Sequence, residues 1–430
     1  MIGFLLIAIF AVFAVLMFTR KIPALLAVPM MAVLIAAAVG TPFSALLNDI
    51  ISAGSIKLAA AYVAVFAGAM LGRVMMQTGI AEGLIKRAAE FGGDKPLVVA
   101  FGLMFVTAVL FTSLTGVGAI IMVGSLVLPI MMSLGIPRKL AGTFFLLAFA
   151  TGFIFNISLI RFYREILQVA PDAPLPPEIV RFQLVLLAVM TAGTIIYTII
   201  SAKRSPELAL MTAETKEELT DKINDKNAPL ISFITPLVPL VLYFGFNNFG
   251  WKEVPSFLAG SIYGTLITQP KRAIQILTSS LIRGLEDGAP AAILMMGIGM
   301  LINALQLPAV KLALEPLIKN LPIVSPWTYV LFFGILSPLA LYRGPFNLFG
   351  LGAGFFAIVA GAGLIPAIAV LAAAMAIVQL QNVCDPTNTH NVWVANYVGV
   401  RVEELTKSTI ATMIVICFIG LIFGALMFLR

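Results

Sequence analysis

The stretch QNVCDPTNTHNVW, residues 381–393, decides how the fold of this chain is understood. It places an aspartate, a proline, several amides and the only histidine of the sequence where the surrounding hydropathy calls for a membrane helix. Pro386 has no amide hydrogen and disfavours a continuous helix. A broken helix exposes backbone groups, and a membrane tolerates these only where they are buried in protein or line a wet cavity. The stretch therefore predicts a broken helix at a polar site.

The composition outside this stretch is that of an integral membrane protein. Of the 430 residues, 60% are hydrophobic and 11% are charged. Apolar runs of about 18 residues, the length that spans a bilayer core, recur along the chain. The first run, residues 2–18, is followed by Arg20 and Lys21 without a cleavage site, which predicts a retained helix. We expect an all-α, multi-pass protein of the inner (plasma) membrane, with the lipid bilayer as its surroundings.

The formal net charge of +7 fits basic cytoplasmic loops, and we expect no nucleic acid as a partner. Residues 203–228 carry both signs of charge and little to bury, which predicts a cytoplasmic linker. The linker separates a first repeat, residues 1–202, from a second, residues 229–430. Shifting the sequence by 229 residues aligns the apolar runs and pairs Asn156 with Asp385. The basic residues fall on one side if both termini lie outside, so the repeats are expected to be inverted.

Two segments predict re-entrant hairpins. Residues 96–135 contain two apolar arms around FTSLTGVG, with basic residues on both flanks, and are expected to enter from the cytoplasm. Residues 326–363 are the equivalent segment, with LYRGPFNLFG at the tip, and are expected to enter from outside. Two ordinary helices with a glycine-rich bend are the alternative. The expected architecture has about ten spanning helices, two hairpins and two broken helices.

The polar residues at these tips and breaks form the expected site, because half-helix N-termini, hydroxyls, amides and an arginine together suit an anion. Substrate binding is expected at Ser113, Thr115, Gly116, Asn156, Ser158, Arg343, Asn347, Thr387 and Asn388. The coupling ion, H⁺ or Na⁺, is expected at Asp385, Asn382 and Asn156, with His390 as a further proton site. We expect no organic cofactor, no metal beyond Na⁺ and no catalytic residues, since the chain has no HExxH motif.

Several of these residues have structural alternatives. Asp385 is also suited to capping the following half-helix, and a hydrogen-bonded His390 needs no titration. Arg343 is long enough to reach the outer surface instead of the site. Arg161 pairs in sequence with an acid four residues later and indicates a structural ion pair. Arg73, near the inner end of its helix, is expected to extend toward the membrane surface.

Three segments resemble the gluconate permease family, within the wider ion-transporter superfamily of carboxylate and cation carriers. They are LFTSLTGVGAIIMVGSLVLPIMMSLGIP, GAMLGRVMMQTGIAEGLIKRAAEFG and HNVWVANYVGVRVEELTKSTIATM. The resemblance implies an inverted-repeat, homodimeric, elevator-like symporter of a small organic anion, such as a gluconate-like acid or a di- or tricarboxylate. A cation/proton antiporter of the same superfamily and a membrane subunit that works with a separate solute-binding protein are the alternative functions.

Overall fold

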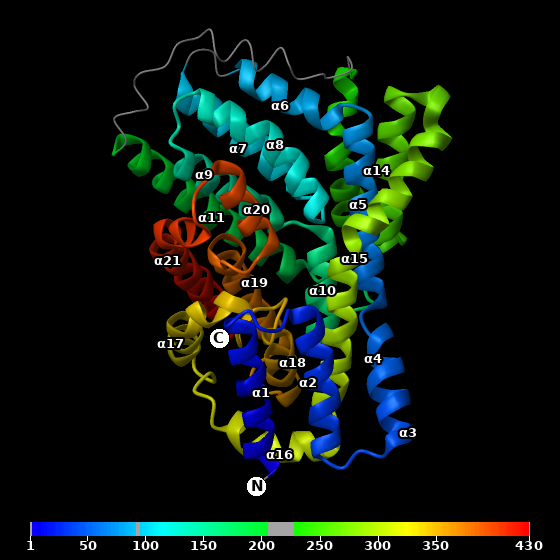
Figure 1. Ribbon diagram of the computed structural model, residues 1–430, viewed down its shortest axis with the longest axis vertical. Coiled ribbons are helices and arrows are strands. Elements are labelled where there is room, and N and C mark those ends of the chain that lie inside the picture. Colours follow the sequence, from blue (N-terminus) through cyan, green and yellow to red (C-terminus); the bar gives the residue numbers. More distant parts are fainter. Residues whose placement is uncertain (1, 92–94, 205–227, 430) are drawn as a thin grey trace.

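The computed structural model describes residues 2–91, 95–204 and 228–429, and within these ranges all regular structure is helical (Figure 1). The first half contains α1 (Ile2–Phe18), α2 (Ala24–Ala38), α3 (Phe43–Ala45), the π-helix η1 (Leu46–Ser52), α4 (Ala53–Ile56), α5 (Ala59–Gln77), α6 (Ile80–Phe91), α7 (Pro96–Phe111), α8 (Val117–Ser133), α9 (Arg138–Phe153), α10 (Ile157–Leu167) and α11 (Pro177–Lys203).

The second half contains η3 (Leu230–Leu237), α13 (Val238–Leu240), η4 (Val241–Gly245), η5 (Asn247–Phe249), α14 (Glu253–Thr268), η6 (Pro270–Arg272), α15 (Ala273–Leu305), α16 (Pro308–Lys319), α17 (Pro326–Leu336), η7 (Ser337–Arg343), α18 (Gly352–Ala362), α19 (Ala367–Cys384), α20 (Thr389–Val398) and α21 (Val402–Phe428). The expected linker, residues 203–228, lies almost entirely outside the described residues.

The elements of the second half follow those of the first in the same order. Both α9 and α19 begin directly after a proline, Pro137 and Pro366, and these prolines are 229 residues apart. In Figure 1, α6 lies at the upper end of the molecule and its counterpart α16 at the lower end. Opposite ends are what an inverted repeat requires. The division of the chain into residues 1–202 and 229–430 stays a prediction.

The predicted class, an all-α polytopic membrane protein, is confirmed. Within the described residues, five helical stretches are long and apolar enough to span a bilayer, or six if the bent pair α9 and α10 is one span. The five are Phe43–Gln77, Pro177–Lys203, Pro270–Leu305, Ala367–Val398 and Val402–Phe428. Further apolar helices of 10–17 residues include both arms of the first hairpin. At 1.5 Å per residue they are at most about 25 Å long, which explains the difference from about ten full spans.

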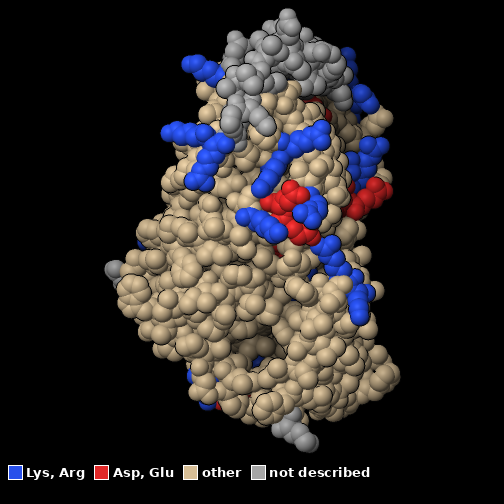
Figure 2. Space-filling model, turned by 60° about the vertical axis from the view of Figure 1, so that its left-hand side comes forward, with Lys and Arg blue, Asp and Glu red and all other residues tan. Residues whose placement is uncertain are grey.

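The surface agrees with a membrane location. Large apolar side chains such as Phe4, Phe105 and Trp327 are mostly exposed on the protein surface, as residues that face lipid are. Figure 2 shows Lys and Arg side chains gathered over the upper part of the molecule, above a broad region with few charges. The multi-pass membrane protein is thus supported, whereas the inner membrane and the outside position of both termini stay predictions.

The helices form two groups that hold the site between them. In one group, α15 packs against α2, α4, α5 and α14. In the other, α19 packs against α21, α9 and α18, while α7 packs against α9 and α17 against α21. The groups meet where α10 contacts α5 and where α18 contacts α15. Both hairpins and both broken helices therefore belong mainly to the second group.

Candidate functional site

A cavity of about 200 Å³ lies where the two hairpin tips meet the two broken helices. It is the place that the broken-helix argument predicts, because the ends of half-helices need a polar or wet environment. The lining residues come from the first tip (Phe111, Leu114, Thr115, Gly116, Val117, Ile120), from α9 (Phe149, Phe153), from the second tip (Arg343, Phe349), from the second break (Gln381, Asn382, Asn388, Thr389, His390) and from α2 and α15 (Leu25, Pro290, Ala291, Leu294).

Both breaks have a local cause. The second break follows Cys384, where α19 ends, and Pro386 lies between it and the start of α20 at Thr389. The first break separates α9 from α10 with a bend of 61°. There, Asn156 is the N-cap of α10, and its side-chain oxygen accepts a hydrogen bond from the Leu159 amide at 3.2 Å. The two broken helices of the sequence prediction are present.

The cation of the cavity is Arg343. Its Nη1 group donates to the Phe349 carbonyl oxygen at 3.0 Å, and it forms no ion pair with a described residue. Tyr342 and Arg343 both have a positive φ, 55° and 58°, a conformation that costs about 1–2 kcal/mol per non-glycine residue. The tip is thus held in a strained conformation that brings the guanidinium group to the cavity wall.

Two amide side chains of the cavity wall have buried donors without a hydrogen-bond partner in the described structure. These donors are Nδ2 of Asn382 and Nε2 of Gln381. The Gln381 side chain is fixed by its other end, where Oε1 accepts from the Leu348 amide at 2.9 Å. A buried unsatisfied donor costs about 1–3 kcal/mol. An acceptor supplied by a ligand would remove that cost.

Two helices begin at the cavity without a side-chain cap. Asn388 is the N-cap of α20 and Gly116, with a φ of 87°, is the N-cap of α8, and neither residue caps its helix through a side-chain hydrogen bond. The first amide groups of a helix have no partner within the helix, and its N-terminus carries partial positive charge. Together with Arg343 and the two amides, these ends make the cavity electropositive and suited to an anion.

The remaining polar wall is ordered by hydrogen bonds within the second broken helix. The His390 ring nitrogen Nε2 is 2.8 Å from the Asn382 carbonyl oxygen, and the ring lies 4.7 Å from the Phe149 ring. Asn388 donates from Nδ2 to the Gln381 carbonyl at 2.9 Å. His390 thus lines the cavity while one of its nitrogens bonds to the backbone.

Asp385 lies beside the cavity and does not line it. The residue is fully buried, and its carboxylate accepts four hydrogen bonds. The donors are the Tyr342 amide at 2.9 Å, Nδ2 of Asn347 at 2.7 Å, the Thr387 amide at 2.9 Å and the Thr387 hydroxyl at 2.7 Å. Three of these donors bond to Oδ1 and only Nδ2 of Asn347 bonds to Oδ2, so Oδ2 keeps one acceptor position. Asp385 therefore joins the second hairpin tip to the second break.

Asn156 has the equivalent position in the first half. Its Nδ2 group donates to the carbonyl oxygens of Phe111 and Leu114, both at 3.0 Å. These carbonyls belong to the first hairpin tip, so Asn156 joins that tip to the first break. We call Asn156 with its two carbonyls the amide clamp, and Asp385 with its four donors the carboxylate clamp.

The structure brings together part of the predicted site. Thr115, Gly116, Arg343, Asn382, Asn388 and His390 line the cavity. Ser113 donates to the Pro236 carbonyl at 2.5 Å and Ser158 to the Ala64 carbonyl at 3.0 Å, both outside the cavity lining. Asn156, Asn347, Thr387 and Asp385 belong to the clamps. Their roles in binding substrate or ion stay predictions.

Sequence reasoning missed the aromatic part of the cavity and one ion pair. Phe149 and Phe153 are four residues apart on α9, a spacing that places them on one helix face. Arg73 does not extend freely to the membrane surface, because its Nε and Nη2 groups bind the Asp287 carboxylate at 2.6 and 2.7 Å. The partner lies 214 residues away in the sequence. No local signal could have indicated this pair.

Two groups of helices, two broken helices and two hairpin tips around one cavity define a polytopic helical membrane protein. No protein-family model matches the sequence, and no curated protein matches it. The chain is similar to the crystal structure of the YdaH transporter of Alcanivorax borkumensis, with a TM-score of 0.60 and 14% sequence identity. The similarity covers 93% of this chain and 97% of that one. At this identity the likeness shows a shared fold.

Proposed function

We propose that the protein is a secondary active transporter that imports a small organic anion. The observation that carries the proposal is the cavity itself, where Arg343, without an acidic partner among the described residues, meets two unsatisfied amide donors and two uncapped helix N-termini. Every one of these groups favours negative charge. The transporter fold and the resemblance of the sequence to gluconate permeases support the same class.

The residues that line the cavity favour some organic anions over others. The cavity contains one arginine, which suits a single carboxylate better than the two or three of a di- or tricarboxylate. The lining also contains the rings of Phe111, Phe149, Phe153 and Phe349, and a polyhydroxy acid would leave hydroxyls unsatisfied against them. We therefore favour a monocarboxylate with an apolar body over a gluconate-like acid.

The proposed transport cycle follows from the two groups of helices. The group with both hairpins carries the cavity, and it would move against the group built on α15 in an elevator-like manner. A homodimer would hold the α15 group fixed in the membrane, and coupling to H⁺ or Na⁺ would drive accumulation. Asp385 is a buried carboxylate at the second break, and we propose it as the coupling residue, together with Asn382 and Asn156.

Binding measurements on Arg343→Gln test the proposal. A set of organic acids is first screened by thermal shift on the purified protein, with and without Na⁺. Loss of a charge-assisted hydrogen bond costs about 1.5–3 kcal/mol, so the affinity for the best acid should fall about 10- to 100-fold. Arg181→Gln, an exposed change on α11, is the matched control.

An unchanged affinity in Arg343→Gln would remove the anion site from this cavity. Cation exchange by liposomes that contain the wild-type protein and no organic anion would instead support the antiporter alternative. A requirement for added solute-binding protein before any uptake occurs would support the subunit alternative.

A further inference from the structure

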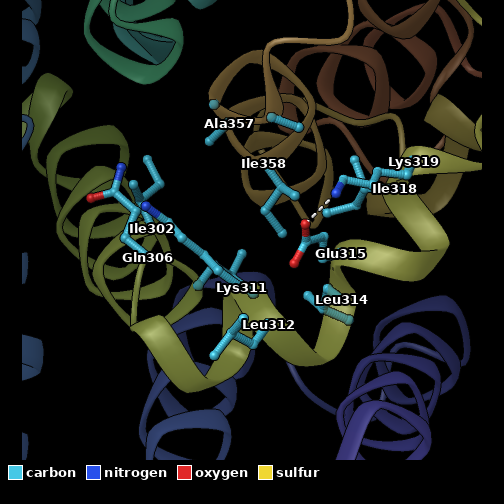
Figure 3. A pocket seen from close by; sticks show the side chains of 13 residues that line it. Ile302, Gln306, Lys311, Leu312, Leu314, Glu315, Ile318, Lys319, Ala357 and Ile358 are labelled. Carbon is cyan, nitrogen blue, oxygen red and sulfur yellow. Dashed lines mark ion pairs between the residues drawn. The ribbon is translucent and has the colours of Figure 1, made fainter.

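A second cavity, of about 250 Å³, lies between α15, α16 and α18, away from the proposed substrate site. Figure 3 shows its wall, where Ile302, Leu312, Leu314 and Ile358 surround an apolar interior. The short helix α16 contributes Lys311, and also Glu315 and Lys319, which form an ion pair at 2.5 Å. A charged edge next to an apolar interior is the pattern of a site for an amphipathic molecule.

The cationic edge is more extensive than the cavity lining alone. Lys57, the C-cap residue of α4, donates from Nζ to Oε1 of Gln306 at 3.2 Å, and Gln306 lines the cavity. Lys57 thus bonds to a lining residue of the same cavity that Lys311 lines. Neither lysine forms an ion pair with a residue in the described ranges. The acid of the same lining, Glu315, is paired with Lys319, so Lys57 and Lys311 favour an anion at this edge of the cavity.

The repeat shows that this charge is specific to the second cavity. At the offset of 229 residues, Lys57 corresponds to Glu286 and Lys311 to Glu82. Both glutamates line a separate cavity of about 500 Å³ between α5, α8 and α15, in the place that the inverted repeat gives to the counterpart. The fold therefore builds this kind of cavity twice, and only one copy is basic. The basic copy lies at the predicted outer side, where basic residues are not expected.

We propose that the cavity between α15, α16 and α18 binds an anionic phospholipid. One acyl chain occupies the apolar interior, and the headgroup phosphate binds Lys57, Lys311 and the amide of Gln306. The phospholipid is favoured over a soluble anion because α16 exposes Leu312 and Leu317 beside the charged edge, as a helix at a membrane interface does. Because the cavity lies between α15 and α18, the bound lipid contacts both groups of helices.

The test is native mass spectrometry of the full-length protein with phosphatidylglycerol or phosphatidylcholine. The wild type should retain phosphatidylglycerol preferentially. A surface lysine contributes about 1 kcal/mol to binding of an anionic lipid, so K57Q/K311Q should bind phosphatidylglycerol about thirtyfold more weakly. K139Q/K271Q removes the same charge at exposed positions elsewhere and should bind like the wild type.

A second variant tests the apolar part. A Cβ atom at Gly361, a lining residue, meets no atom within 4 Å, so Gly361→Leu should fill the cavity without displacing the backbone. It should lose phosphatidylglycerol, whereas Gly361→Ala should retain it. Equal binding by K57Q/K311Q and the wild type would overturn the proposal. So would full competition by inorganic phosphate, which would make the lysines a simple anion site.

Discussion

The two halves of this molecule place equivalent positions around one cavity and fill them with different chemistry. Leu114 of the first tip corresponds to Arg343 of the second, and Phe153 of the first break corresponds to Asn382 of the second. All four residues line the cavity. The first half thus provides three of the four phenylalanine rings in the lining, and the second half provides the arginine, the amides and the histidine. The inverted repeat places equivalent backbone positions around the cavity. Different residues at these positions make one side of the cavity more polar than the other, which suits the amphipathic anion that we propose as substrate.

The two clamps also occupy equivalent positions in the two halves and differ in chemistry. Asn156 donates to carbonyls of its tip, whereas Asp385 accepts from amide and hydroxyl groups of its tip and break. The two residues occupy equivalent positions, but the side chain of Asn156 is a hydrogen-bond donor to its tip and that of Asp385 is an acceptor. Only the carboxylate clamp carries a negative charge, and it holds the second tip through the amide of Tyr342, the residue before Arg343. The comparison predicts that the two clamps differ in stability and in function.

The largest expected effect comes from deleting the clamps. Asp385→Ala leaves several buried donors without an acceptor and should lower the free energy of unfolding by about 3 kcal/mol or more. Asn156→Ala removes one cap and two hydrogen bonds and should cost about 1–2 kcal/mol. Thermal unfolding in detergent measures both. A larger loss for Asn156→Ala would show that the carboxylate clamp is not the stronger support.

The next comparison concerns charge alone. Asp385→Asn keeps the shape and removes the negative charge, so it resembles a neutralised clamp. If Asp385 couples transport to a cation, the variant should bind the anion within about threefold of the wild type and lose the dependence of binding on pH or Na⁺. Binding titrations across pH and Na⁺ concentration in both proteins measure this.

The opposite substitution completes that experiment. Asn156→Asp puts a carboxyl group against the carbonyl oxygens of Phe111 and Leu114, where it can donate only when protonated, so it should destabilise the first tip more strongly as the pH rises. Retention of the full cation dependence by Asp385→Asn would leave Asp385 with the clamp role only. The coupling site would then lie elsewhere.

The sequence was sufficient for the parts of the fold that follow from backbone chemistry. Pro386 and the polar residues around it indicate the second break, because no continuous lipid-facing helix tolerates them. The pairing of Asn156 with Asp385 then locates the first break. The first tip followed from basic residues on both flanks of a segment with a polar centre, and the second tip followed from the repeat.

The sequence was not sufficient for the composition of the cavity wall. A phenylalanine that faces lipid, packs in the core or lines a cavity looks the same in a hydropathy pattern, so Phe149 and Phe153 gave no signal. Polar residues were recognised as candidates, but their hydrogen-bond partners could not be predicted, because a buried hydroxyl bonds either to the backbone or to a ligand. Which one occurs depends on tertiary contacts, such as that of Ser113 with the Pro236 carbonyl.

The apolar wall provides a smaller effect that sharpens the comparison between the halves. Phe153→Ala should weaken binding of a monocarboxylate with an apolar body about tenfold, because it removes a ring from the first-half wall. Binding of a short acid such as acetate should not change. Phe105→Ala, at a side chain that is 69% exposed on α7, is the control for lipid-facing rings. Equal losses for both acids would indicate a general disturbance of the site.

The smallest effect separates two hydroxyls of the first tip. Thr115 lines the cavity and also donates to the Val65 carbonyl at 3.0 Å, while Ser113 is turned to the Pro236 carbonyl. The single hydroxyl hydrogen of Thr115 can turn from the Val65 carbonyl to an anion in the cavity, so Thr115→Val, which keeps the shape and removes that donor, should reduce anion affinity about threefold. Ser113→Ala should leave the affinity unchanged and cost about 1 kcal/mol of stability, because a buried carbonyl loses its donor. Isothermal titration and thermal unfolding of both variants distinguish these effects. If Ser113→Ala weakened binding as much as Thr115→Val, the first tip would act as one rigid unit, and its contact with the Pro236 segment would help to set the affinity.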